Sequence, residues 1–122
     1  MAFVFLLERP EMKGVQKINH RVDIVAFYEA TNNLHDGMVA FTDLSGDCLR
    51  VGVDVTSLED CPRVEMIFRG VKKWQIKNGD YIFGSLIGFE DNGVIWTDAC
   101  SFDDEILKNS IYVRAASMEW VI

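Results

Sequence analysis

The sequence predicts a mainly β protein, or an α+β protein with one short helix, in which an antiparallel meander of five to seven strands forms a sandwich or an open barrel. Apolar residues recur with the strand period of two from residue 38 onward. Turn sequences rich in Gly, Asn and Asp separate these segments. Asn92-Gly93 between two apolar runs is a strong hairpin signal. A length of 122 residues, with 49% hydrophobic and 25% charged residues, predicts one globular domain over residues 1–122.

The first third of the chain has the least regular pattern. Phe3–Leu7 is apolar and short, and we expect it to form an edge strand. Val22–Leu34 is the one segment predicted to be a helix, ending near Asn32-Asn33. Residues at helical spacing support this helix: Val22, Val25, Ala26, Glu29 and Ala30. A strand over Arg21–Tyr28 is the alternative.

The middle of the chain predicts a hairpin. Met38–Leu44 is the first strand of this part, and Ser45-Gly46-Asp47 has the composition of a tight turn. Cys48–Val55 follows with a strict alternation that is typical of a half-buried antiparallel strand. The side chains predicted to share its inner face are Leu49, Val51, Val53 and Val55.

The remaining strands are longer. Residues 56–62 form a polar loop, and Arg63–Lys77 is an extended segment that we expect to bend or bulge near Gly70. A turn over residues 77–80 ends it. Further strands are expected at Tyr81–Glu90, Val94–Phe102 and Ser110–Trp120.

The formal charge of −7 comes from one segment, Asn78 to Leu107, which has seven carboxylates and no Lys or Arg. The other 12 of the 19 acidic residues are balanced by 12 Lys and Arg. Charge that is localised in this way indicates what kind of partner a protein has. The seven residues are Asp80, Glu90, Asp91, Asp98, Asp103, Asp104 and Glu105.

A hairpin with Asn92 and Gly93 as its two loop residues fixes a register. It places Phe89 opposite Trp96, Ile87 opposite Asp98, Phe83 opposite Phe102 and Asp80 opposite Glu105. Four carboxylates then gather at the open end of the hairpin: Asp80, Asp103, Asp104 and Glu105. By alternation, Asp98 shares a face with five apolar side chains: Phe83, Ile87, Phe89, Val94 and Trp96.

Each of these two features has more than one interpretation. The four-carboxylate cluster is a solvated rim that prevents edge-to-edge aggregation, a docking patch for a basic partner, or a weak calcium or magnesium site. Asp98 is a carboxylate satisfied by backbone N–H groups or an arginine, or a ligand-binding residue with a raised pKa.

Catalytic and cofactor motifs are absent from the sequence. Neither a nucleophile-elbow nor a P-loop pattern occurs, and the two histidines lack the spacing of a zinc site. His35-Asp36 is found in metal-dependent phosphohydrolases, but with Gly37 it is better interpreted as a turn leading into a strand, with the imidazole bonded to backbone. We expect no cofactor and no bound metal.

The composition indicates the cellular location of the protein and the classes of partner that it is expected to bind. A pI of about 4.7 argues against nucleic-acid binding, which needs clustered Lys and Arg. The apolar run Ala2–Leu7 lacks the positive flank of a signal peptide and is too short to span a bilayer. Cys48, Cys61 and Cys100 form no C-x-x-C pair, which favours reduced thiols and a cytoplasmic location. A homodimer through an unpaired edge strand is compatible with all of this.

Several short patterns resemble a known group of proteins. Leu34-His35-Asp36-Gly37 leads into a strand, the alternating strand Leu49–Val55 follows, and Val64–Val71 precedes Trp74. These steps, over roughly residues 34 to 98, resemble small bacterial β-sandwich proteins of unknown function, some of which resemble immunity proteins of polymorphic toxin systems. The resemblance implies a protein partner, a cytoplasmic location and no cofactor, and it brings no catalytic residues.

The sequence therefore predicts a small non-enzymatic protein-binding domain, with an immunity protein or inhibitor of a basic toxin as its specific form. The partner-binding residues on this hypothesis are Asp80, Phe102, Asp103, Asp104 and Glu105. The alternative is a β-domain that binds a small ligand or divalent metal in a pocket formed by Asp98, Trp96 and Phe89. An enzyme is the third alternative, although no nucleophile–base pair is visible in the sequence.

Overall fold

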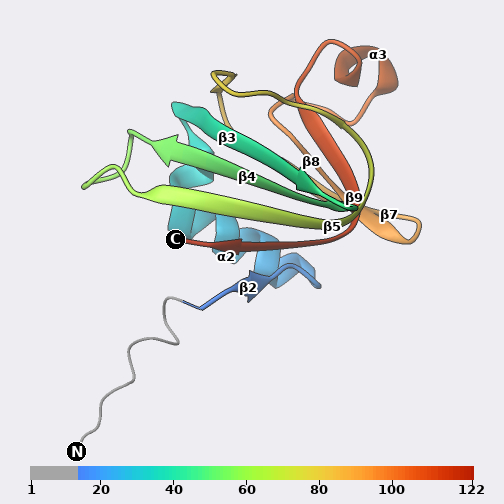
Figure 1. The fold of residues 1–122 in the computed structure, drawn as a ribbon, viewed down its shortest axis with the longest axis horizontal. Helices are drawn as coiled ribbons and strands as arrows, with labels where there is room; N and C mark the ends of the chain where they lie inside the picture. The colour runs from blue at the N-terminus through green and yellow to red at the C-terminus, as the bar shows by residue number, and fades with distance from the viewer. Residues whose placement is uncertain (1–13) are drawn as a thin grey trace, which may run out of the picture.

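A computed structural model describes residues 14–122, which fold around one curled antiparallel sheet (Figure 1). The strand order is β6-β3-β4-β5-β9-β8-β7, and β2 pairs with β9 beside this path. Two meanders, β3-β4-β5 and β7-β8-β9, are thus joined through the β5–β9 pair. This confirms the mainly β class with one short helix, and the open barrel rather than the sandwich. The expected strand Phe3–Leu7 lies outside the described residues.

The strands of the first meander lie close to where the sequence places them. β3 spans Gly37–Ser45, β4 spans Cys48–Val55 and β5 spans Arg63–Gln75. The predicted inner face of β4 is fully buried at all four positions. β5 bends as expected: Gly70 has a φ of 64°, and its pairing with β9 shifts between Val71 and Lys73.

The second half of the sheet departs from the sequence prediction. The expected strand over residues 81–90 is two strands, β6 (Tyr81–Ile82) and β7 (Leu86–Glu90), separated by residues 83–85. β8 (Gly93–Thr97) ends before Asp98, and a short helix, α3 (Asp104–Leu107), precedes β9 (Tyr112–Val121). With β2 (Gln16–Lys17), the described sheet has eight strands, one more than the upper expectation.

The predicted helix is present, and its buried face does not consist of the residues whose spacing predicted it. α2 spans Arg21–Thr31, and a 3-10 turn, η2, continues over Asn32–Leu34. Asn32 ends α2 with a φ of 51°, as the Asn32-Asn33 signal predicts. The side chains that α2 buries are Ile24, Phe27 and Thr31. The residues chosen for their helical spacing, among them Val22 and Ala26, are exposed.

The main core lies between α2 and the sheet (Figure 1). Phe27 packs edge-on against Trp120, with ring centroids 5.5 Å apart. The other face of β8 and β9 carries a small second cluster of Ile95, Leu107 and Tyr112, under α3. Because β8 is buried on both faces, its sequence is a continuous apolar run and does not alternate.

The β7–β8 hairpin corrects the predicted register. Phe89 pairs with Val94 and Ile87 with Trp96, so the loop residues are Asp91 and Asn92. Asn92 has the positive φ, 60°, that was expected of the loop. Gly93 is the first residue of β8, where a Cβ would collide with the carbonyl oxygen of Ala115. The Asn-Gly pair marks the turn correctly, but the glycine serves close packing instead of turn geometry.

Candidate functional site

The corrected register separates the predicted four-carboxylate cluster into two places. Asp80 belongs to the turn before β6, where its Oδ2 accepts a hydrogen bond from the backbone N–H of Lys77 at 2.8 Å. The other three residues, Asp103, Asp104 and Glu105, lie at the start of α3. The β7–β8 pairing stops at Leu86 and Thr97, so it brings Asp80 and Glu105 into no cross-strand pair.

The carboxylates of α3 already have local partners. Asp103 is the N-cap, and its Oδ1 accepts from the backbone N–H of Glu105 at 2.9 Å. Asp104 lies 3.9 Å from Arg114, and Glu105 lies 2.8 Å from Lys108. Capping and ion pairing therefore account for these three acidic residues without an external partner. Phe102 lies over Gly88 on the β7 side, where a Cβ on Gly88 would be 2.8 Å from its ring.

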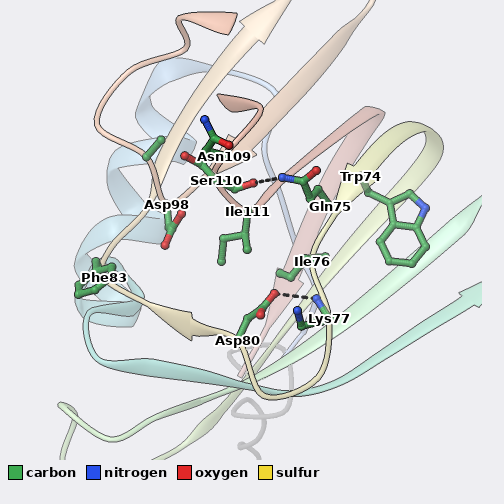
Figure 2. Close-up of a pocket in the computed structure, with 11 residues that line it drawn as sticks. Trp74, Gln75, Ile76, Lys77, Asp80, Phe83, Asp98, Asn109, Ser110 and Ile111 are labelled. Carbon is green, nitrogen blue, oxygen red and sulfur yellow. Dashed lines mark hydrogen bonds between the residues drawn. The ribbon is translucent and has the colours of Figure 1, made fainter. Parts of the chain in front are cut away.

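An open pocket of about 700 Å³, which we call the Asp98 pocket, is formed within residues 14–122 (Figure 2). It lies at one end of the curled sheet, between the end of β5, the turn before β6, the segment after β8 and the loop before β9. Its volume is in the range of small-molecule sites. Its lining residues are Trp74, Gln75, Ile76, Lys77, Asp80, Phe83, Asp98, Ala99, Asn109, Ser110 and Ile111.

Hydrogen bonds hold the walls of the pocket in place. The Gln75 amide nitrogen donates to the carbonyl oxygens of Ser110 (2.7 Å) and Lys108 (3.1 Å), which joins β5 to the loop before β9 (Figure 2). The Thr97 hydroxyl donates to the carbonyl of Ile111 at 2.7 Å. Asp98 N–H donates to the same carbonyl at 3.3 Å. Asp98 is thus anchored by its backbone.

Phe83 is positioned from two sides. The His35 ring bonds the Phe83 carbonyl oxygen through Nδ1 at 2.8 Å, which confirms the predicted bond from this imidazole to backbone. Two residues further on, the Ser85 hydroxyl accepts from the indole N–H of Trp96 at 2.9 Å in the core. These contacts hold segment 83–85 against the sheet end and leave the Phe83 ring exposed beside the pocket.

The electrostatics of the pocket center on Asp98. Partial burial raises the pKa of Asp98 above its ordinary value, and the nearby backbone N–H groups of Ile111 and Phe83 oppose this rise. Repulsion from Asp80 raises the pKa of Asp98 further. Figure 2 shows both carboxylates pointing into the opening beside Ile111. Within residues 14–122, no Lys or Arg side-chain nitrogen lies within 4 Å of either carboxylate.

The other two residues predicted to form a pocket with Asp98 lie elsewhere. Trp96 is fully buried in the main core. Phe89 is exposed and lines a separate groove of about 430 Å³ between α2 and β7, together with Phe102. The end of β8 explains this, because the alternation that grouped the three residues does not continue past Thr97 to Asp98.

Sequence reasoning missed most of the residues that surround Asp98 in space. Ile76 and Ile111 come from segments that are distant from Asp98 in the sequence, and no local pattern links them to it, whereas the alternation did place Phe83 on the face of Asp98. Trp74 is exposed at the pocket, with its indole pointing away from the opening (Figure 2). The one available signal was Asp98 itself, a carboxylate directly after an apolar run.

The chemistry available in the pocket is recognition of positive charge. Two carboxylates supply acceptors, and Phe83 supplies an aromatic face. No group of three His, Cys, Asp or Glu side chains that could hold a metal ion occurs within residues 14–122. His20, the second histidine, is at the N-terminus of α2, where Asp23 Oδ2 accepts from its backbone N–H.

Comparisons of the chain with protein-family models, with curated proteins and with solved structures found no match. None of the helices in residues 14–122 has both the length and the hydropathy that are needed to cross a bilayer. The function is therefore inferred from the geometry of the site.

Proposed function

We propose that the chain is a non-enzymatic binding domain in which the Asp98 pocket receives a cationic group, an ammonium or a guanidinium, of its partner. One observation carries this proposal: Asp98 is a partly buried carboxylate with a raised pKa on the wall of an open pocket, and no Lys or Arg side-chain nitrogen of residues 14–122, including that of Lys77 in the same lining, lies within 4 Å of it.

The physical reason is the cost of a partly buried charge without a counter-ion. Desolvation and the neighbouring Asp80 both disfavour the ionised form of Asp98. A bound cation replaces the lost hydration and screens the repulsion between the two carboxylates. The face of Phe83 adds a second favourable contact for the same cation.

The test is an NMR titration with N-acetylarginine amide and N-acetyllysine amide, with the neutral citrulline analogue as the matched control ligand. We expect the two cations to shift the backbone amides of Phe83, Asp98 and Ile111, and citrulline to leave them in place. Asp98→Asn should remove the response. Asp91→Asn, an equal change of charge at the exposed hairpin turn, should retain it.

The pH dependence has a defined sign. The cation binds the ionised form of Asp98, so binding is lost as pH falls through the raised pKa of this carboxyl. The loss should begin at a higher pH than for a carboxylate with the ordinary value of 3.8. Equal binding of arginine and citrulline, or unchanged binding by Asp98→Asn, would contradict the proposal.

A second candidate is a docking surface for a basic protein at α3. The side chains of Asp104 and Glu105 are 92% and 80% exposed, and Phe102 and Ile106 are exposed beside them. On this hypothesis the acidic residues steer the partner, and the association rate falls with ionic strength. Asp103→Asn with Asp104→Asn should slow association, and an association rate indifferent to salt and to these changes would remove the candidate.

The resemblance to immunity proteins makes the proposal more specific: the partner is a basic toxin in the cytoplasm. The three cysteines are unpaired in the structure, as a reducing location would require. Under this form of the proposal, the toxin presents a Lys or Arg side chain to the Asp98 pocket. Co-purification with the product of a neighbouring toxin gene would test it, and loss of that association in Asp98→Asn is the expected result.

A further inference from the structure

Three apolar side chains form a continuous exposed strip that leads out of the Asp98 pocket. Phe83 lines the pocket and is 69% exposed. Its ring packs edge-on against Tyr81, with centroids 4.9 Å apart. Tyr81 is 43% exposed and is the cross-strand partner of Met38, which is 49% exposed. We call Met38, Tyr81 and Phe83 the aromatic strip.

The strip has no cover within residues 14–122 and lies at an edge of the sheet. β6 pairs with β3 alone, so the outer side of Tyr81 and Phe83 faces away from any further described strand. Ile82, between them, points the other way and is fully buried. Single exposed apolar residues are ordinary, but a contiguous strip with two aromatic rings is typical of an interaction surface.

The charges along the strip are mostly negative. Asp80 and Asp98 lie at the pocket end, and Asp36 accepts a hydrogen bond from the Tyr81 hydroxyl. The positive or titratable groups nearby are His35, whose Nε2 is 3.4 Å from Asp36, and Lys77 in the pocket lining. Beside Met38, its β4 partner Asp54 is ion-paired with Arg63 at 2.8 Å. The carboxylates disfavour an anionic lipid surface and favour a basic partner.

From this continuity we infer that the partner is a protein segment that inserts a Lys or Arg side chain into the Asp98 pocket and lays a neighbouring apolar side chain on the aromatic strip. The inference rests on the proposed function and extends it from a cationic group to a basic, partly apolar polypeptide. Aromatic residues that surround a charged anchor are the usual composition of an interface hot spot.

The test uses short peptides with one arginine, followed at one to four residues by either leucine or glycine, and free N-acetylarginine amide as the small-cation probe. We expect at least one leucine peptide to bind about fivefold tighter than its glycine counterpart or more, because burial of the leucine side chain on the strip should contribute about 1 kcal/mol. Met38→Gln should remove this difference and leave the affinity for N-acetylarginine amide unchanged, because Met38 is not part of the pocket lining.

Leu44→Gln is the matched control, since Leu44 lies on the same strand and is also 49% exposed. It should bind the leucine peptides like the unmodified protein. If N-acetylarginine amide binds but no leucine position raises the affinity, or if Met38→Gln keeps the leucine preference, the inference is wrong and the proposed function stands. If neither N-acetylarginine amide nor any peptide binds, both are wrong.

Discussion

The hydrogen bond between Ser85 and Trp96 gives the sharpest prediction about how the site is held together. The indole nitrogen of Trp96 is fully buried, and the Ser85 hydroxyl at 2.9 Å is its acceptor. Ser85→Ala removes this acceptor and leaves the N–H without a partner in the core. The same bond fastens segment 83–85 to β8, so its loss also loosens Phe83 beside the Asp98 pocket.

The magnitude follows from the burial of the donor. Leaving a buried neutral N–H without an acceptor costs about 1–3 kcal/mol, which is a large part of a typical domain stability of roughly 5–15 kcal/mol. In a chain of 122 residues, each kcal/mol lowers Tm by about 4 °C, so the expected decrease is roughly 4–12 °C. Ser57→Ala, which removes an exposed serine hydroxyl bonded to the His35 carbonyl, is the matched control and should cost about 0.5 kcal/mol or less.

The assay is urea unfolding followed by far-UV circular dichroism, applied to Ser85→Ala, Trp96→Phe and the double variant. Trp96→Phe removes the donor, so the double variant leaves no orphan N–H. We therefore expect the double variant to lose about 1–2 kcal/mol less than the sum of the two single variants. A stability of Ser85→Ala within about 0.5 kcal/mol of the unmodified protein, or additivity in the cycle, would refute this reasoning.

Three further predictions concern Asp98, Gly93 and Asp103. Because the pKa of Asp98 is raised in the folded state, the folded protein binds its proton more tightly than the unfolded chain does, and stability falls as pH rises from about 3.8 through the raised pKa. Asp98→Asn should therefore be more stable than the unmodified protein at pH 7, and the difference should vanish below pH 3.8 in chemical denaturation measured across pH. Gly93→Ala should destabilise by roughly 1–3 kcal/mol, because the new Cβ meets the Ala115 carbonyl oxygen; a neutral result in thermal unfolding would contradict the described register. Asp103→Ala should cost about 0.5–2 kcal/mol through loss of the α3 cap, whereas Asp103→Asn, which keeps a capping side chain, should cost less; equal effects in the same melts would show that charge matters and capping does not.

The first meander could be predicted from the sequence because its signals are local. Alternation in Cys48–Val55 reports one buried face directly, and the structure buries all four residues of that face. Gly70 marked the bend of β5, and Asn32 marked the end of α2. In each case one residue type or one period determines the local backbone, and the rest of the fold agrees with it.

The second half of the sheet could not be predicted in the same way. β8 is buried on both faces, so its apolar run has no alternation that reports a register or an end. Gly93 allows β8 to approach β9 closely, and the sequence carries no sign of this contact. Because the prediction placed Gly93 in the turn, the predicted partner of each β7 residue lies two residues too far along the chain, as Trp96 instead of Val94 for Phe89. The spacing of residues such as Val22 and Ala26 predicted the helix α2 but not its buried face, because these residues are exposed in the structure.

The candidate site was predicted only in part. Asp98 was identified as a carboxylate beside apolar residues, and the expectation that a binding-site Asp98 has a raised pKa agrees with the structure. Its companions Trp96 and Phe89 were wrong, because β8 ends at Thr97 and the alternation that grouped them with Asp98 does not reach Asp98. Asp80, which was predicted to belong to the four-carboxylate cluster, lines the Asp98 pocket instead. A site assembled from four separate segments depends on tertiary packing, which no local spacing encodes.

The position of β9 has a consequence for the order of folding. β9 is the last strand along the chain, and it pairs with β5, β8 and β2. The hairpins β3–β4 and β7–β8 can form as soon as their own residues leave the ribosome, because their contacts are local. The two halves of the sheet have no common strand until Tyr112–Val121 is synthesised. The Asp98 pocket, whose walls come from both halves, should therefore form only after β9 has been synthesised.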